Sequence, residues 1–590
     1  MFYQLFRSPT ASGRRPRPMH RLRQQPRLEQ LEDRCMLSAN VVLEWNAIAL
    51  DALKNDSMLG ANSKQNAPIR ASRALAIVQA AVFDAVNSID GSYDPYLIKV
   101  RTDPRASITA AAAQAAHDTL AALFPDFIPT LDADLAADLA NIPSGRRRDE
   151  GVRVGKIVAT GMLAARSNDG ADVSMPYTPG NLPGQWRPDP LHPNQQALGS
   201  LWGEVTPFAL RSGEQFHVPP PPALTSLDYA KAYLEVKNLG GNGVTTPTQR
   251  TAEQTTIGIF WGYDGSPGLA TPPRLYNQIA ELIATKQHNT VVQNARFFAL
   301  IDIALADAGI ACWDGKYDFS FWRPITAIRE NDLGTGPTGL GSGNPFLVGQ
   351  GDPSWSPLGA PADNGNGTNF TPPFPAYASG HATFGAALFK MMANFYGRDN
   401  IHFTIGSDEF NGVTRDQNGV VRPVVTRSFT SFSQAAEENG QSRIYLGIHW
   451  IFDKVEGIHC GSSVADFVFK HTLRPRSDDG QGGGGDARAS MAAAHLGSST
   501  SSPDSLGVTA NLNQSGLPRS ATPKLNEWEP ALLTAAPNVQ AEVSQSTAAS
   551  QTIGTTSDQL DAKLPGDGIP SRLLTGLSGT YLCQLSPTET

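Results

Sequence analysis

Apolar residues recur at every third or fourth position along most of the chain between residues 39 and 475. This spacing is typical of amphipathic helices, because it places the apolar side chains on one face. It predicts helices at residues 68–89, 107–124, 130–142, 149–166, 228–239, 275–284 and 291–311. Alternating apolar and polar residues, typical of half-buried strands, are scarce. The pattern therefore predicts an all-α fold, a large helical bundle joined by loops.

Residues 173–222 interrupt this pattern because they are rich in proline and glycine. We expect a long, ordered excursion over the surface there. A second loop, at residues 363–367, has the sequence Asp-Asn-Gly-Asn-Gly, which is faintly similar to a calcium-binding loop. The glutamate that such a loop needs at its twelfth position is absent, since that position is Phe374. We interpret residues 363–367 as a plain loop.

Two terminal segments lack the helical pattern. Residues 1–38 contain eight arginines and three acidic residues, without an aromatic or helical pattern. Such a basic arm can contact nucleic acid or anionic lipid, but we interpret it as a disordered or removed leader. Residues 28–38 also resemble a leader motif of exported proteins from one bacterial group, which implies an extracellular or periplasmic location.

The C-terminal segment, residues 476–590, is dominated by Ser, Thr, Ala, Gly and Pro. It has too few large apolar residues to offset the entropy lost on folding, so we expect a low-complexity, disordered tail. The predicted organisation is a leader at residues 1–38, one helical domain at 39–475 and the tail at 476–590.

The chain has 590 residues, a formal charge of −8 and 17% charged residues. This composition excludes a highly charged disordered chain and a generally basic nucleic-acid binder. No stretch reaches about 18 unbroken apolar residues, so no membrane span is expected. The four cysteines form no C-x-x-C pair; Cys312 and Cys460 fall in the helical domain, either paired or as two buried thiols.

Three segments carry the candidate chemistry: KYDFSFWRP at 316–324, FPAYASGH at 374–381 and SRIYLGIHWIFD at 442–453. Lys316, Arg323 and Arg443 provide three cations. Ser379 provides a hydroxyl, and Gly380 a backbone N–H at the start of an expected helix. Together these donors suit a tetrahedral oxyanion with several negative oxygens.

Two histidines in the same segments complete the set. Of His381 and His449, one can act as an acid or base and the other can bond to the central atom of the oxyanion. Each residue alone is weak evidence, because an isolated Arg or Ser-Gly-His is usually a surface residue or a turn. The order and internal spacing of the whole set are much more specific.

The pattern Lys-x6-Arg-Pro, Ser-Gly-His and Ser-Arg-x5-His-x3-Asp resembles the signature shared by vanadium-dependent haloperoxidases and type 2 phosphatidic acid phosphatases. The haloperoxidases are the more similar group, because residues 70–76, 259–265, 271–277 and 306–310 also resemble their sequences. The resemblance covers roughly residues 67–473. It implies the haloperoxidase type of helical bundle, with vanadate as cofactor.

The resemblance also implies the roles of the site residues. The vanadate oxygens would be held by Lys316, Arg323, Ser379, the Gly380 N–H, His381 and Arg443. His449 would ligate vanadium and His381 would be the acid–base residue. Asp264 would pair with Arg443, and Lys316 would also polarise bound peroxide.

Trp313 and Phe374 match aromatic residues that line the halide side of the family's site, and Asp453 would support a histidine. One residue departs from the family pattern: Ala378 stands where proline usually precedes Ser-Gly-His, which puts the affinity and rate of the site in doubt. The implied reaction oxidises halide with hydrogen peroxide, at the vanadate anchored by His449, to a hypohalous acid equivalent. That product would halogenate a small organic acceptor. A homodimer is compatible with the resemblance.

Two alternatives remain open. The first is an acid phosphatase, in which His449 is the phosphoryl nucleophile and His381 the general acid. The lack of membrane spans and the haloperoxidase-like segments outside the three motifs both disfavour it. The second is an exported, non-catalytic protein that binds an oxyanion. Three buried positive charges repel one another when no anion is bound, so a protein without a functional site would not need to retain all three. This disfavours the second alternative.

Overall fold

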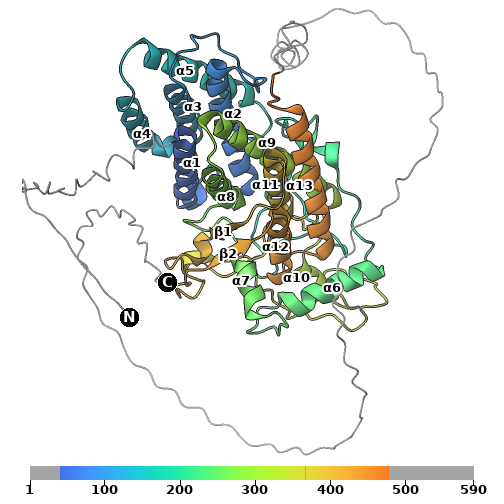
Figure 1. The fold of residues 1–590 in the computed structure, drawn as a ribbon. Coiled ribbons are helices and arrows are strands. Elements are labelled where there is room, and N and C mark those ends of the chain that lie inside the picture. Colours follow the sequence, from blue (N-terminus) through green and yellow to red (C-terminus); the bar gives the residue numbers. More distant parts are fainter. Residues whose placement is uncertain (1–39, 366, 477–590) are drawn as a thin grey trace, which may run out of the picture. The chain divides into compact units, whose positions relative to one another are not determined.

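The computed structural model describes residues 40–365 and 367–476, and these residues fold mainly as helices (Figure 1). The helices are α1 (Val41–Ser57), α2 (Pro68–Asp90), α3 (Ile108–Leu123), α4 (Ile128–Ala140), α5 (Arg146–Arg166), α6 (Leu227–Gly240), α7 (Ala252–Phe260), α8 (Pro272–Lys286), α9 (Val291–Phe319), α10 (Pro324–Arg329), α11 (Gly380–Tyr396), α12 (Phe432–Tyr445) and α13 (Ile451–His471). Two short strands, β1 (Phe403–Gly406) and β2 (Thr426–Phe429), pair antiparallel. The predicted all-α class is confirmed, whereas the predicted leader and all but the first residue of the predicted tail lie outside the described residues.

The long helix α9 differs from its prediction in a way that matters for the site. It continues to Phe319, eight residues beyond the predicted end at 311. No proline interrupts residues 312–319, and the helix ends only where Ser320 turns left-handed, with φ of 46°. At its start, Thr290 and Gln293 form a reciprocal capping box. The added two turns carry Trp313 and Lys316.

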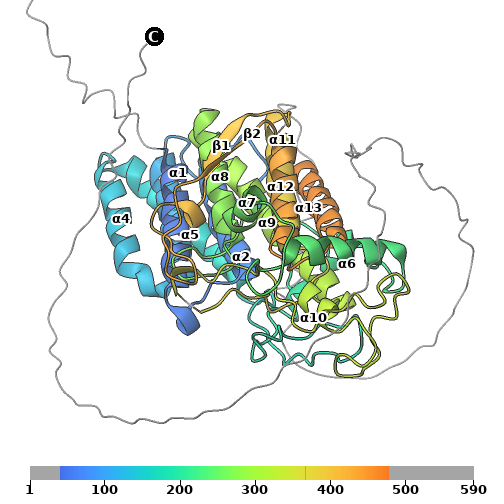
Figure 2. The same ribbon diagram turned by 90° about the horizontal axis from the view of Figure 1, so that it is seen from below.

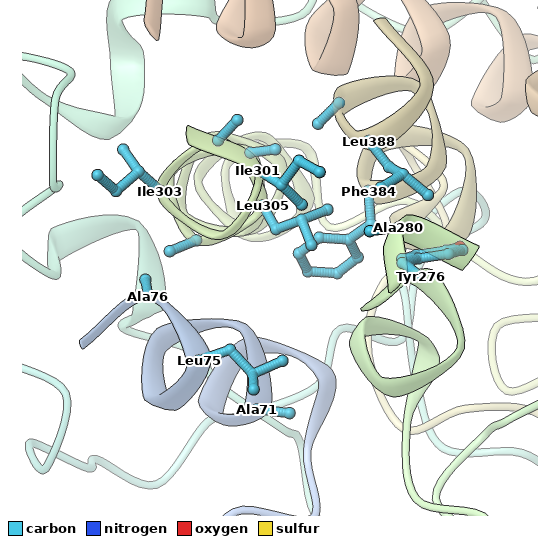
Figure 3. Packing of buried hydrophobic residues seen from close by; sticks show 14 of the residues in the cluster. Ala71, Leu75, Ala76, Tyr276, Ala280, Ile301, Ile303, Leu305, Phe384 and Leu388 are labelled. Carbon is cyan, nitrogen blue, oxygen red and sulfur yellow. The ribbon is translucent and has the colours of Figure 1, made fainter. Parts of the chain in front are cut away.

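Helix α9 lies at the centre of the bundle, packed against α2, α11 and α13 (Figure 2). Apolar side chains of four helices meet in this core, as Figure 3 shows. They include Leu75 of α2, Tyr276 of α8, Leu305 of α9 and Phe384 of α11. Burial of such side chains stabilises the bundle by roughly 1.5–3 kcal/mol each.

Helices α11 and α13 approach each other closely because glycines of α13 face the backbone of α11. A Cβ atom at Gly461 would lie 2.0 Å from the Thr383 carbonyl oxygen, and one at Gly457 would lie 2.9 Å from the Ser379 carbonyl oxygen. The Ser379 N–H also donates to the Asp453 carbonyl at 3.0 Å. These contacts place the N-termini of the two helices side by side, so the second and third motifs meet.

The excursion at residues 173–222 is ordered, as predicted, but it does not lie only on the surface. It contains two short 3₁₀ helices, η4 (Trp202–Glu204) and η5 (Gly213–Phe216), which pack against α9. Trp186 and Trp202 are buried. Cys312 and Cys460 are both buried free thiols, so they do not form a disulfide.

Candidate functional site

The predicted site residues come from six parts of the chain and converge at the N-termini of α11 and α13. They are Asp264 after α7, Trp313 and Lys316 on α9, Arg323 before α10, Phe374 and Ser379–His381 in the segment that leads into α11, Arg443 on α12 and His449 before α13. All but Asp264 are buried, and the side chain of Asp264 is only 5% exposed. Two helix N-termini add partial positive charge beside the three cations, which favours a bound anion.

His449 has one ring nitrogen that donates and one that carries a lone pair. Its Nδ1 lies 2.7 Å from the Asp453 carboxylate, to which it donates. Its Nε2 accepts from Arg323 Nη1 at 3.0 Å and therefore carries a lone pair. Burial, followed by the charges of Arg323 and Lys316, holds the pKa of His449 well below its usual range. The neutral Nδ1–H form is the tautomer that can bond to a central atom through Nε2.

Asp453, which fixes this tautomer, is fully buried at the first turn of α13. The same oxygen that accepts from His449 also accepts from the Trp450 N–H at 3.1 Å. Burial raises the pKa of Asp453 to about 7. The prediction that Asp453 supports a histidine is confirmed by this geometry.

The two guanidinium groups present donors that no protein atom accepts within the described residues. Arg323 donates to the Phe374 carbonyl at 2.9 Å and the Ile448 carbonyl at 2.8 Å, and its Nη2 has no partner. Arg443 donates from Nη2 to both Asp264 oxygens, at 2.6 and 2.9 Å, and its Nε and Nη1 have no partner. The predicted pairing of Asp264 with Arg443 is thus present. Buried unpaired donors are costly, so these three nitrogens point to an anionic ligand with several oxygens.

The Lys316 ammonium faces the loop that precedes α11. It donates to the Pro375 carbonyl at 2.8 Å, to the Ala376 carbonyl at 3.0 Å and to the Ala378 carbonyl. Three carbonyls use all three N–H groups of an ammonium. Burial lowers the pKa of Lys316 to about 7. The structure therefore shows Lys316 fixing the loop that carries Ser379, and its predicted bond to an oxyanion oxygen stays a prediction.

The start of α11 is built as expected. Ser379 is its N-cap residue and Gly380 its first helical residue, so the N–H groups of the first turn have no helical acceptor. The next residue, His381, donates from Nε2 to the Gly262 carbonyl at 2.8 Å, because a carbonyl can only accept. Burial and the nearby Arg443 lower the pKa of His381 to about 4. His381 is therefore neutral at physiological pH, with its Nδ1 free to accept a proton.

Trp313 and Phe374 form an aromatic wall against the cations. Their ring centroids lie 4.9 Å apart. The Lys316 Nζ is 5.0 Å and the Arg323 Cζ 4.9 Å from the Phe374 centroid, both within cation–π range. The indole of Trp313 also borders a cavity of about 630 Å³, which is lined by Ser200, Leu201, Gly203, Glu204, Glu214, His217, Trp313, Asp314, Tyr317 and Asp318.

The donors fit vanadate better than a bare metal cation. Within residues 40–365 and 367–476, no group of three or more His, Cys, Asp or Glu side chains could hold a metal ion. Instead, the lone pair of His449 Nε2 lies beside Arg323, and both Arg323 and Arg443 have guanidinium nitrogens without a partner. A tetrahedral oxyanion that is bonded through its central atom needs this combination of one nitrogen ligand and several hydrogen-bond donors.

Several supporting contacts were not predicted from the sequence. The Gly262 carbonyl orients His381, and the His381 carbonyl in turn accepts from the Tyr276 hydroxyl at 3.1 Å and the Asn439 amide at 2.7 Å. Asn439 lies one helical turn before Arg443, and Tyr276 lies in the haloperoxidase-like segment 271–277. The helical spacing could have indicated Asn439, whereas a backbone carbonyl leaves no signal in a sequence.

The fold and the site together define a helical bundle with a buried site for an oxyanion beside a histidine. Residues 296–478 match the family of the VCPO second helical-bundle domain. The chain is 38% identical over 318 residues to the vanadium chloroperoxidase of Curvularia inaequalis, covering 48% of this chain and 49% of that protein. The chain thus spans about half the length of this relative.

Solved structures show the same fold. A bacterial vanadium-dependent iodoperoxidase superposes with a TM-score of 0.59 at 24% identity, covering 74% of this chain and 98% of the other. A holo-type bacterial vanadium-dependent chloroperoxidase gives a TM-score of 0.51 at 18% identity, covering 69% and 92%. The resemblance to the vanadium-dependent haloperoxidases is therefore confirmed by the family match of residues 296–478 and by the identity to the vanadium chloroperoxidase. In the described part of the chain, no helix is both long and apolar enough to cross a membrane.

Proposed function

We propose that this protein is a vanadate-dependent haloperoxidase. The observation that carries the proposal is His449, whose Nδ1–H is fixed by Asp453 and whose Nε2 lone pair lies beside Arg323, one of the two arginines with unpaired donors. His449 Nε2 would hold vanadium, and the free donors of Arg323 and Arg443 would hold its oxygens. Ser379 and the Gly380 N–H lie at the same helix start and would complete the set.

Vanadate supplies a Lewis acid that binds hydrogen peroxide and makes its oxygen susceptible to attack by halide, without a change in the metal's oxidation state. The chain supplies the proton acceptor. Nε2 of His381 is committed to the Gly262 carbonyl, so Nδ1 is the atom that takes the peroxide proton. Because the pKa of His381 is about 4, this base is unprotonated at neutral pH.

Trp313 and Phe374 would form the halide side. A halide ion that contacts these rings loses part of its hydration. The positive charges of Lys316 and Arg323, which lie against the same rings, offset that loss electrostatically. The overall reaction balances as one halide, one hydrogen peroxide and one proton giving one hypohalous acid and one water. The halide is oxidised by two electrons and the peroxide is reduced by two. The hypohalous acid would then halogenate a small organic acceptor.

The experiment is a titration of apo-protein with orthovanadate in the presence of hydrogen peroxide and bromide, with phenol red as halogen acceptor. Bromination should rise with vanadate and disappear in His449→Ala. A matched control is His459→Ala, because His459 lies on α13, the helix that follows His449, with a side chain 69% exposed. If His459→Ala loses activity to the same extent, the assignment of His449 is wrong.

The same protein should be tested with p-nitrophenyl phosphate. Turnover without vanadate, inhibited by vanadate and absent in His449→Ala, would establish the phosphatase alternative in place of our proposal. Binding of vanadate with neither activity would support the non-catalytic alternative. Homodimerisation and export are further predictions; the leader-like segment on which export depends lies outside the described residues.

A further inference from the structure

The segment between α7 and α8 contributes two contacts to the site from neighbouring residues. The Gly262 carbonyl accepts from His381 Nε2 at 2.8 Å, and the Asp264 carboxylate binds Arg443 at 2.6 and 2.9 Å. The placement of this short segment therefore sets the tautomer of the acid–base histidine and the orientation of an oxyanion-binding arginine at the same time. Tyr263 lies between Gly262 and Asp264. A residue that fixes the position of Tyr263 therefore affects both the His381 and the Arg443 contact.

Tyr263 is held at both ends. Its backbone is left-handed, with φ of 54°, which is unfavourable for a bulky residue and needs external support. Its N–H donates to Glu409 Oε1 at 2.9 Å, and its hydroxyl accepts from the Asp408 N–H at 2.7 Å. A Cβ atom at Gly262 would lie only 2.3 Å from the same Glu409 oxygen, so the carboxylate lies directly against the segment.

Glu409 is itself fixed inside the protein. It and Asp363 are fully buried, and both accept from Arg422 Nη1, at 2.7 and 2.6 Å. Burial and the neighbouring Asp363 raise the pKa of Glu409 well above its usual range, which favours its neutral form. The loop at 363–367 therefore has a structural role, because its first residue supplies the second carboxyl group of this cluster.

We propose that Glu409 is a positioning residue of the active site, which acts by holding the Tyr263 N–H and thereby aims the Gly262 carbonyl at His381 and the Asp264 carboxylate at Arg443. Among residues 40–365 and 367–476, the side chain of Glu409 bonds to Tyr263 and Arg422, and the Tyr263 segment connects it to the site. Its effect on turnover rests on the proposed haloperoxidase function. Its effect on oxyanion binding does not, because Arg443 can hold an oxyanion whether or not the protein oxidises halide.

Asp363 offers a matched control. It shares Arg422 with Glu409 and is equally buried, but its backbone bonds to Ser266 and its side chain to Arg422 rather than to residues 262–264. Glu409→Ala and Asp363→Ala each remove one buried carboxyl group from the same guanidinium, so both should lower thermal stability. Only Glu409→Ala should release the Tyr263 segment. Glu409→Gln should keep function, because its amide oxygen can still accept from Tyr263. It loses only the bond from Arg422 Nη1, since an amide nitrogen cannot accept.

The first readout is the Kd for orthovanadate on the full-length apo-protein, measured by isothermal titration calorimetry. We expect Glu409→Ala to weaken binding by about 10- to 100-fold, as is common when a supporting partner of a ligand-binding residue is lost. Asp363→Ala and Glu409→Gln should stay within about threefold of wild type. The second readout is bromination at saturating vanadate, where Glu409→Ala should lower kcat and leave the KM for bromide nearly unchanged.

Equal loss of vanadate affinity in Glu409→Ala and Asp363→Ala would overturn the proposal, because it would show a general loss of packing. So would wild-type affinity in Glu409→Ala. If Glu409→Ala does not fold, Glu409→Asp serves instead, since its shorter side chain keeps a carboxyl group near Arg422 but withdraws from Tyr263. A wild-type protein that binds vanadate without brominating would refute the proposed function, while the affinity comparison would still decide the role of Glu409.

Discussion

Replacing Asp453 tests whether one buried carboxylate sets the state of His449, the histidine that we propose as the vanadium ligand. A single oxygen of Asp453 accepts from both His449 Nδ1 and the Trp450 N–H, at 2.7 and 3.1 Å. Asp453→Ala removes this acceptor and frees the ring to rotate or to move its proton to Nε2. A protonated Nε2 cannot ligate a metal, so the fraction of protein competent to bind vanadate falls.

The magnitude follows from the two hydrogen bonds. A buried donor that loses its acceptor is destabilised by about 1–3 kcal/mol. His449 avoids this destabilisation by rotating its ring or by moving the proton to Nε2, and neither form can bind vanadate. Each 1.4 kcal/mol corresponds to about tenfold in an equilibrium constant, so the Kd for vanadate should rise by about 10- to 100-fold. Asp453→Asn should do less, because its amide oxygen can keep both hydrogen bonds. Its amide N–H₂ would take the place of the Asp453 oxygen that has no partner within the described residues.

The assay is calorimetric titration of orthovanadate into apo-protein at pH 7, with unfolding in urea as the measure of stability. Asp466→Asn is the control, because Asp466 lies on the same helix and pairs with Lys390 near the surface. Wild-type affinity in Asp453→Ala would refute the tautomer argument. A loss in Asp453→Asn as large as that in Asp453→Ala would show that the charge matters and the orientation does not.

Three other variants test separate parts of the structure. Burial raises the pKa of Asp302 to about 8, so the folded state binds one more proton than the unfolded state between about pH 4 and pH 8. The free energy of unfolding therefore falls as the pH rises through this window. Asp302→Asn should remove up to about 1.4 kcal/mol per pH unit of that decline, measured by unfolding in urea. Gly461→Ala should destabilise the protein by more than about 2 kcal/mol, because the new Cβ would lie 2.0 Å from the Thr383 carbonyl oxygen. Gly406→Ala is the control and should leave the thermal midpoint unchanged, because its new Cβ would have no atom within 4 Å. Arg443→Lys keeps the charge but loses the planar set of donors, so we expect about 10- to 100-fold weaker vanadate binding by calorimetry, and unchanged affinity would contradict the role of the unpaired nitrogens.

The sequence by itself determined the helical class and the chemical identity of the site. Local periodicity is enough to place helices such as α2, because each apolar face repeats within one segment. The spacing within motifs is also local, so Ser379 at the start of α11 and Asp453 one turn after His449 could be expected to act together. The end of α9 was missed, because a helix without a breaker stops where tertiary contacts require it.

Only the tertiary structure decided which partners those residues have. The unpaired donors of Arg323 and Arg443, the Lys316 ammonium facing three carbonyls, and the Gly262 carbonyl on His381 all depend on segments far apart in the chain. Every residue has a backbone carbonyl, and whether a donor has a partner depends on its neighbours in space. Neither feature can therefore be read from the order of amino acids. Glu409 illustrates the same limit, since it acts on the site through a peptide N–H 146 positions away.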